Sequence, residues 1–82
     1  MKILVWEVRT SKGFTLMELS KKSGIGKSTI NNIENGKVSP TLFQLEMIAI
    51  ALGVNITDLF ESEYKDLYHN AAGFRQQEER FP

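Results

Sequence analysis

The 82-residue sequence predicts a small all-α domain, because short apolar segments alternate with residues that stop helices. Glycine or an Asn-Gly pair follows most of these segments, and residues typical of helix N-termini precede several of them. The N-terminal segment 2–12, KILVWEVRTSK, is rich in β-branched residues, but no other segment predicts a partner strand. A helix that ends at Gly13 is therefore the better interpretation of this segment.

The next part of the chain predicts two short helices joined by a tight turn. Thr15 and Glu18 have the spacing of a capping box, which predicts a helix over residues 16–23. A Gly-Ile-Gly turn at 24–26 leads into another helix, over residues 27–34, and the Asn-Gly pair that follows is a strong stop signal.

Two further helices are expected before residue 60. The Ser-Pro dipeptide at 39–40 is expected to start a strongly apolar helix over residues 41–52, which ends at Gly53. Asn55 or Thr57 is then expected to cap a short fifth helix. The fourth helix is apolar nearly all round, so its extra face is expected to meet the tail or a second subunit.

Residues 61–82 predict a C-terminal helical extension and a polar tail, separate from a main domain over residues 1–60. Tyr64, Leu67 and Tyr68 have the i, i+3, i+4 spacing of one helix face. They could pack back onto the body or form a dimer seam, and the sequence does not separate these possibilities.

The composition excludes several kinds of site. The chain has no cysteine, which excludes disulfides and thiolate metal sites, and its single histidine, His69, cannot build a metal cluster. We expect no enzyme, no cofactor and no small-molecule ligand, because no acid–base pair or activated nucleophile is evident. The apolar runs are too short to span a membrane and no secretory signal is present, so we expect a cytoplasmic protein.

The charge is distributed unevenly, although its net value is zero. Residues 1–60 hold seven Lys and Arg against five Asp and Glu, whereas residues 61–82 hold three against five. The acidity therefore lies in the tail, and the main domain keeps a weak positive balance that is compatible with binding to phosphates.

The stretch GIGKST, residues 24–29, raises the possibility of a phosphate-binding loop. That motif needs its first glycine five positions before the Gly-Lys-Ser triplet, at position 21, where this chain has Lys21. No buried strand is predicted before the stretch, so we exclude a nucleotide-binding loop.

The helix over residues 27–34 has two chemically different faces at 100° per residue. Ile30 and Ile33 point one way. The opposite arc carries Lys27, Ser28, Asn31, Asn32 and Asn35. Asparagine is a poor helix former, and amides pair with adenine edges while lysine reaches guanine or phosphate. Contacts to DNA or a merely polar surface both account for this helix taken alone.

The segment from Arg9 to Phe60 resembles the phage repressor and Cro-type helix-turn-helix family, the XRE family. The matching residues are Arg9, Gly13, Phe14, Thr15, Glu18, Leu19, Gly24, Ile25, Ser28, Thr29, Ile30, Ile33, Glu34, Asn35, Gly36, Pro40, Ala51, Leu52, Gly53 and Val54. The resemblance implies a five-helix, lambda-repressor-like DNA-binding domain that acts as a dimer on a palindromic operator.

The resemblance also implies roles for individual residues. The base-reading positions are Lys27, Ser28, Asn31 and Asn32. The phosphate contacts are Thr15, Leu16, Thr29, Asn35 and Lys37. Arg9 and Glu34 match a structural ion pair between the first helix and the recognition helix, and Glu34 needs such a partner because it lies beside the apolar face.

Three residues depart from the family pattern. Leu16 stands where many members have a glutamine that contacts the DNA backbone. Gly26 replaces the usual Ser or Thr cap of the recognition helix. Ser20 replaces a small alanine, and its hydroxyl is expected to bond back to the preceding turn.

These observations together predict a sequence-specific, DNA-binding transcriptional regulator, expected to be a repressor. It would bind double-stranded DNA as a homodimer, with the helix over residues 27–34 in the major groove. The alternative is a protein-interaction module, such as an antitoxin, that keeps the fold while its tail and Trp6 bind a partner. The neutral net charge favours the module, whereas the amide-rich face favours DNA.

Overall fold

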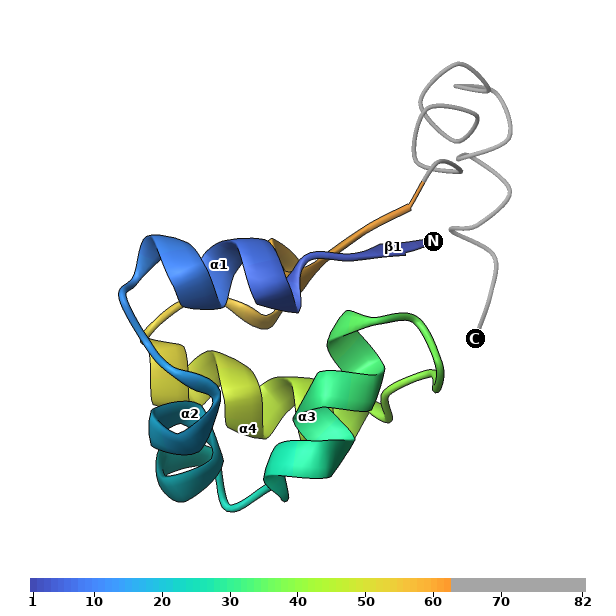
Figure 1. Ribbon diagram of the computed structural model, residues 1–82. Coiled ribbons are helices and arrows are strands. Elements are labelled where there is room, and N and C mark those ends of the chain that lie inside the picture. Colours follow the sequence, from blue (N-terminus) through green and yellow to red (C-terminus); the bar gives the residue numbers. More distant parts are fainter. Residues whose placement is uncertain (63–82) are drawn as a thin grey trace, which may run out of the picture.

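A computed structural model describes residues 1–62 of the chain, and these form a helical domain with a small two-stranded ribbon (Figure 1). The elements in chain order are β1 (Lys2–Ile3), α1 (Val5–Ser11), α2 (Leu16–Ser23), α3 (Lys27–Glu34), α4 (Leu42–Leu52), the 3-10 helix η1 (Ile56–Leu59) and β2 (Phe60–Glu61). The bounds of α2 and α3 are those predicted from the sequence.

The predicted capping box starts α2. The Thr15 hydroxyl accepts a hydrogen bond from the Glu18 N–H at 3.0 Å, and the Glu18 carboxylate accepts one from the Thr15 N–H at 2.8 Å. The helix ends at Gly24, whose φ of +77° is a conformation that glycine adopts without strain. Local sequence signals therefore fix both ends of this helix.

The expectation of a helix over residues 2–12 and of a fold without strands is wrong at the N-terminus. Lys2–Ile3 pairs antiparallel with Phe60–Glu61, with Lys2 opposite Glu61. The Leu4 N–H also donates to the Leu59 carbonyl at 2.8 Å. The partner strand was missed because it is only two residues long and follows η1 directly, so it has no strand-length pattern of its own.

The start of α4 and the nature of the fifth helix also differ from the prediction. Thr41, and not the Ser-Pro dipeptide, caps α4, because its hydroxyl accepts from the Gln44 N–H at 3.0 Å. The fifth helix is a single 3-10 turn after Asn55, whose carbonyl accepts from the Asp58 N–H at 2.9 Å. The described residues thus hold four α-helices and one 3-10 helix, not five α-helices.

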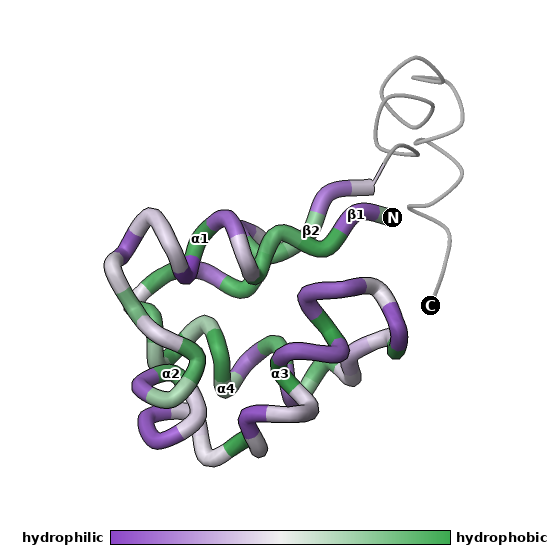
Figure 2. The backbone as a smooth tube through the Cα atoms, viewed as in Figure 1, coloured by the Kyte–Doolittle hydropathy of each residue, from purple (hydrophilic) through white to green (hydrophobic). Residues whose placement is uncertain are grey.

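Every helix contributes to one hydrophobic core, in which α4 packs against α2 and η1. The fully buried side chains are Val5, Leu19, Ile30, Ile33, Ile48 and Leu59. Figure 2 shows that α3 and α2 alternate between hydrophobic and hydrophilic residues. The core therefore holds α3 by one face and leaves its other face available.

The predicted C-terminal helical extension, with Tyr64, Leu67 and Tyr68, lies outside the described residues. Within residues 1–62, no helix is long and apolar enough to cross a membrane. The same part of the chain holds no group of three His, Cys, Asp or Glu side chains that could bind a metal ion.

Candidate nucleic-acid interface

The two faces of α3 have opposite environments. Ile30 and Ile33 have no exposed surface and anchor the helix to the core. Lys27, Ser28 and Asn31 are exposed, whereas Thr29 and Asn32 are half-buried. The predicted base-reading residues therefore share one polar surface on the side of α3 away from the core.

The turn before α3 is held by side chains of α2. The Ser20 hydroxyl donates to the Ile25 carbonyl at 2.7 Å, and the buried Ser23 hydroxyl accepts from the Ile25 N–H at 3.2 Å. The bond from Ser20 runs forward across the turn, not back to the preceding turn as expected from the sequence. Two hydroxyls thus restrain the three-residue connection and the angle at which α3 leaves α2.

The C-terminal end of α3 places two further predicted contact residues at the surface. Asn35 donates its side-chain amide to the Asn31 side-chain oxygen at 3.3 Å, so these amides are linked along one edge of the helix. Gly36 has a φ of +74°, and the Lys37 N–H donates to the Asn32 carbonyl at 2.9 Å. This turn leaves the side chains of Asn35 and Lys37 exposed beside the polar surface of α3.

The N-terminus of α2 offers backbone groups more than side chains. The Thr15 hydroxyl is engaged in the capping box, and the half-buried Leu16 packs against the core. A phosphate at this end would be bound by free backbone N–H groups and by the positive end of the helix dipole. The Glu18 carboxylate already accepts a hydrogen bond from the Thr15 N–H, and its negative charge repels a phosphate at this end of the helix.

Arg9 and Glu34 form a bidentate ion pair that joins α1 to the end of α3. The Arg9 Nε–Glu34 Oε2 distance is 2.6 Å and the Nη2–Oε1 distance is 3.0 Å. Their side chains are only 10% and 3% exposed. Arg9 Nη1 also donates to the Phe14 carbonyl at 2.8 Å, so one guanidinium holds together α1, α3 and the segment before α2.

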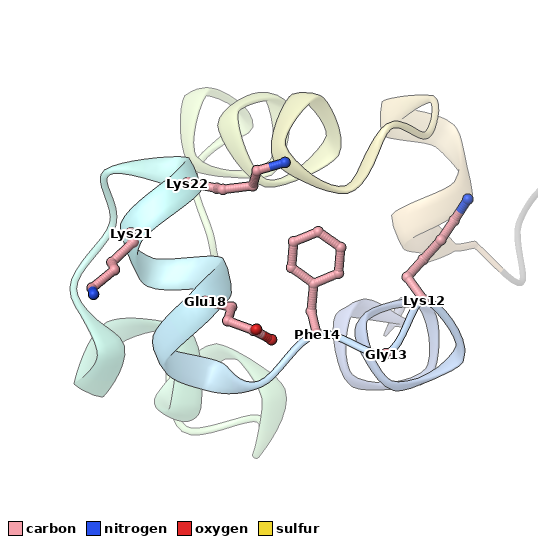
Figure 3. Close-up of a pocket in the computed structure, with 6 residues that line it drawn as sticks. All are labelled: Lys12, Gly13, Phe14, Glu18, Lys21 and Lys22. Carbon is pink, nitrogen blue, oxygen red and sulfur yellow. The ribbon is translucent and has the colours of Figure 1, made fainter.

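A cavity of about 400 Å³ lies between the end of α1 and the outer face of α2 (Figure 3). Its lining residues are Lys12, Gly13, Phe14, Glu18, Lys21 and Lys22. The Lys22 ammonium lies 5.6 Å from the centre of the Phe14 ring, a cation–π distance. None of the predicted DNA-contact residues lines this cavity, and no local sequence pattern predicts it, because its lining residues come from the end of α1, the loop after it and α2.

Two short helices joined by a restrained three-residue turn, the second with a free polar face, define a helix-turn-helix unit. The comparisons with known proteins agree with this class. Residues 7–59 match the family model described as Helix-turn-helix, and the chain belongs to this family, of the Cro/C1 or XRE type. The family comprises DNA-binding transcriptional regulators without enzymatic activity.

Three relatives illustrate the similarity. The chain is 32% identical over 63 residues to the transcriptional regulator SinR of Bacillus subtilis, covering 76% of this chain and 57% of SinR. It is 35% identical to an uncharacterized HTH-type regulator of Archaeoglobus fulgidus, over 83% of this chain and 97% of that one. A similar regulator of Methanothermobacter thermautotrophicus is 39% identical, over 73% and 88% of the two chains.

A solved structure described as the SinR protein/SinI protein complex has the same fold. Its TM-score to this chain is 0.63 at 26% identity, covering 92% of this chain and 87% of that one. The chain spans little more than half the length of SinR itself, so the activity of SinR as a whole is not carried over.

Proposed function

We propose that this protein is a sequence-specific DNA-binding regulator that represses transcription by placing α3 in the major groove. The observation that carries the proposal is the division of α3. Two isoleucines without exposed surface face the core, while an amine, a hydroxyl and amides lie on the other side. A regulator of this kind works in the cytoplasm, where its DNA target lies.

Each polar residue of α3 has a base or phosphate that it suits. The amides of Asn31 and Asn32 suit the N6 and N7 edge of adenine, and Lys27 suits the guanine acceptors. Asn32 is half-buried and is therefore expected to contact a base directly under α3. Asn31 and Ser28 are exposed and can reach bases further from the helix. Asn31 presents its amino group most freely, because its oxygen already accepts from Asn35.

The phosphate contacts surround this reading surface. Asn35 and Lys37 lie just past α3 with exposed side chains, and Thr29 lies at its edge. The free backbone N–H groups of the first turn of α2, beginning at Leu16, serve the opposite strand of the groove, because the Thr15 N–H is already bound to Glu18. Because Leu16 supplies no polar side chain, phosphate binding depends more on Lys37 than in relatives with glutamine at this position.

The second apolar face of α4 supports a homodimer, and a two-fold dimer would bind a palindromic operator. Phe43 and Ile50 are each 67% exposed and lie opposite the buried face of that helix, with Met47 between them. We place the two-fold seam on this face. The two α3 helices would then lie about 34 Å apart on one side of the DNA, one helical turn between half-sites.

The second candidate function is a protein-interaction module. One observation favours it: Trp6 on α1 is 53% exposed, and a large aromatic side chain at the surface suits a protein partner. The similar solved structure described as the SinR protein/SinI protein complex supports this candidate, because it contains two different proteins.

Selection of bound sequences from random duplex DNA with the full chain separates the two candidates. The DNA-binding function predicts an enriched palindrome with half-sites one helical turn apart. If no sequence is enriched over the starting pool at low salt, where phosphate binding is strongest, the interaction module is the better account.

A further inference from the structure

A groove lies between the β1–β2 ribbon and the loop that joins α3 to α4. It consists of two adjoining cavities of about 270 and 210 Å³, which share Met1, Ile3, Ser39 and Pro40. The other lining residues are Gly36, Lys37, Val38, Leu42, Leu45 and Phe60. We call this feature the ribbon groove.

Apolar side chains are exposed along the ribbon groove. Met1 and Leu42 are each 75% exposed, and Val38 is 46% exposed. Three large hydrophobic side chains that are exposed in the described part of the chain therefore line the same groove. Such a contiguous apolar patch favours occupation by another apolar segment.

The chain leaves the described domain at the mouth of this groove. Since Lys2 pairs with Glu61 in the antiparallel ribbon, the register brings Ser62, the last described residue, opposite Met1, which lines the groove. Tyr64 is two residues past Ser62 and Leu67 is five, so they reach at most about 7 and 18 Å from it. Both distances allow the chain to turn back into the groove.

The segment that follows Ser62 is complementary to the groove in apolar pattern and in charge. Tyr64, Leu67 and Tyr68 have the spacing of one apolar helix face. Glu63 precedes Tyr64, and Lys65 and Asp66 lie between Tyr64 and Leu67, so residues 63–68 carry two acidic residues and one basic residue, a net charge of −1. The charged residue that lines the groove is Lys37, so the acidic side chains meet an opposite charge there.

We propose that residues 63–68 of the same chain dock in the ribbon groove, with the Tyr64/Leu67/Tyr68 side chains on the apolar patch and the carboxylates beside Lys37. Docking has a regulatory consequence, which rests on the proposed function. Lys37 is a proposed phosphate contact, so a docked acidic segment competes with DNA for it and attenuates binding.

Paramagnetic broadening in the full chain tests the docking without reference to DNA. Because the chain has no cysteine, a spin label on Ser39→Cys marks the groove and one on Ser11→Cys marks the far end of α1. The Ser39 label should broaden the NMR signals of residues 63–68 strongly, and the Ser11 label should not. Equal broadening by both labels, or none by the Ser39 label, would overturn the proposal.

Two controls assign the broadening to the apolar stripe and to the same chain. The double change Leu67→Ser/Tyr68→Ser should abolish it, whereas Gln76→Ser should leave it unchanged. A mixture of spin-labelled chains and isotope-labelled, unmodified chains should show no broadening of residues 63–68. If broadening occurs only in the mixture, the tail of a second copy fills the groove and the proposal is wrong.

DNA titration tests the regulatory consequence separately. Leu67→Ser/Tyr68→Ser should bind random duplex DNA more tightly than the unmodified chain, with a log–log salt slope steeper by about 0.9 per subunit, the value of one phosphate contact. Adding Lys37→Ala should remove the difference. Unchanged slopes would refute the competition, whereas an absence of any DNA binding would refute the proposed function and leave the docking result standing.

Discussion

Arg9 and Glu34 show how a buried charge pair positions a reading surface. They are 25 residues apart in the sequence, yet two hydrogen bonds join them at the base of α3. Removing one partner leaves the other charge buried without compensation, which costs more than the pair itself contributes. The pair therefore fixes the end of α3 relative to α1.

Glu34→Ala should lower the free energy of unfolding by about 1–3 kcal/mol, because the Arg9 guanidinium is left without its carboxylate. Urea denaturation measures this, and Glu7→Ala, which removes an exposed carboxylate from α1, should change stability by less than about 0.5 kcal/mol. A double-mutant cycle with Arg9→Met should give a coupling energy above about 0.5 kcal/mol. Additive effects would show that the pair does not stabilise the fold.

Lys27→Ala should weaken binding to the preferred DNA site by about 1–3 kcal/mol and weaken random DNA much less, because the side chain reads a base. Lys21→Ala removes the same charge from the exposed face of α2 and should weaken both DNAs slightly and equally. Titrations at one fixed salt concentration compare the two variants. Equal losses on both DNAs for Lys27→Ala would mean that it contacts only phosphate.

At the scale of elements, the helices that position the site start and end on local signals. The capping box of α2 and the glycine turn after it lie within a few residues of the helix ends that they determine, so the sequence predicts α2 and α3 to the residue. The ribbon could not be predicted, because its strands are two residues long and lie at opposite ends of the domain. The forward bond of Ser20 depended on the turn geometry, which no local pattern specifies.

Gly26→Ser should stabilise the domain by about 0.5 kcal/mol by adding the missing cap of α3. Gly26 has a φ of −58°, and an added Cβ would meet the Thr29 hydroxyl at 3.8 Å, an ordinary contact. Gly24→Ser at the other end of the same turn should instead destabilise it by about 1–2 kcal/mol, since its φ is +77°. The unfolding temperatures of the two variants should therefore shift in opposite directions. A shift in the same direction would contradict the assignment of Gly26 as the cap of α3 and of Gly24 as the residue that needs a positive φ.

At the scale of the whole molecule, α4 separates the core from a second apolar surface. One face of this helix is buried, and the opposite face exposes Phe43 and Ile50. A domain this small contacts few base pairs, so a second copy on the same DNA is needed for useful affinity.

Phe43→Glu should convert a dimer into a folded monomer, because the side chain is 67% exposed and a charge at the seam opposes association without disturbing the core. Sedimentation at several protein concentrations measures this. Trp6→Glu, which places the same charge on the exposed part of α1, should leave the dimer intact. A wild-type chain that stays monomeric both free and on DNA would show that the dimer is wrong.

The central claim, that α3 reads bases, is tested most directly by repeating the selection from random DNA with Asn32→Ala beside the unmodified chain. The account predicts that both proteins enrich a palindrome with the same half-site spacing. The variant should lose sequence preference at one position in each half-site, the base pair that the Asn32 amide contacts. An identical motif for both proteins, or a uniform loss of preference at all positions, would contradict the placement of α3 in the major groove.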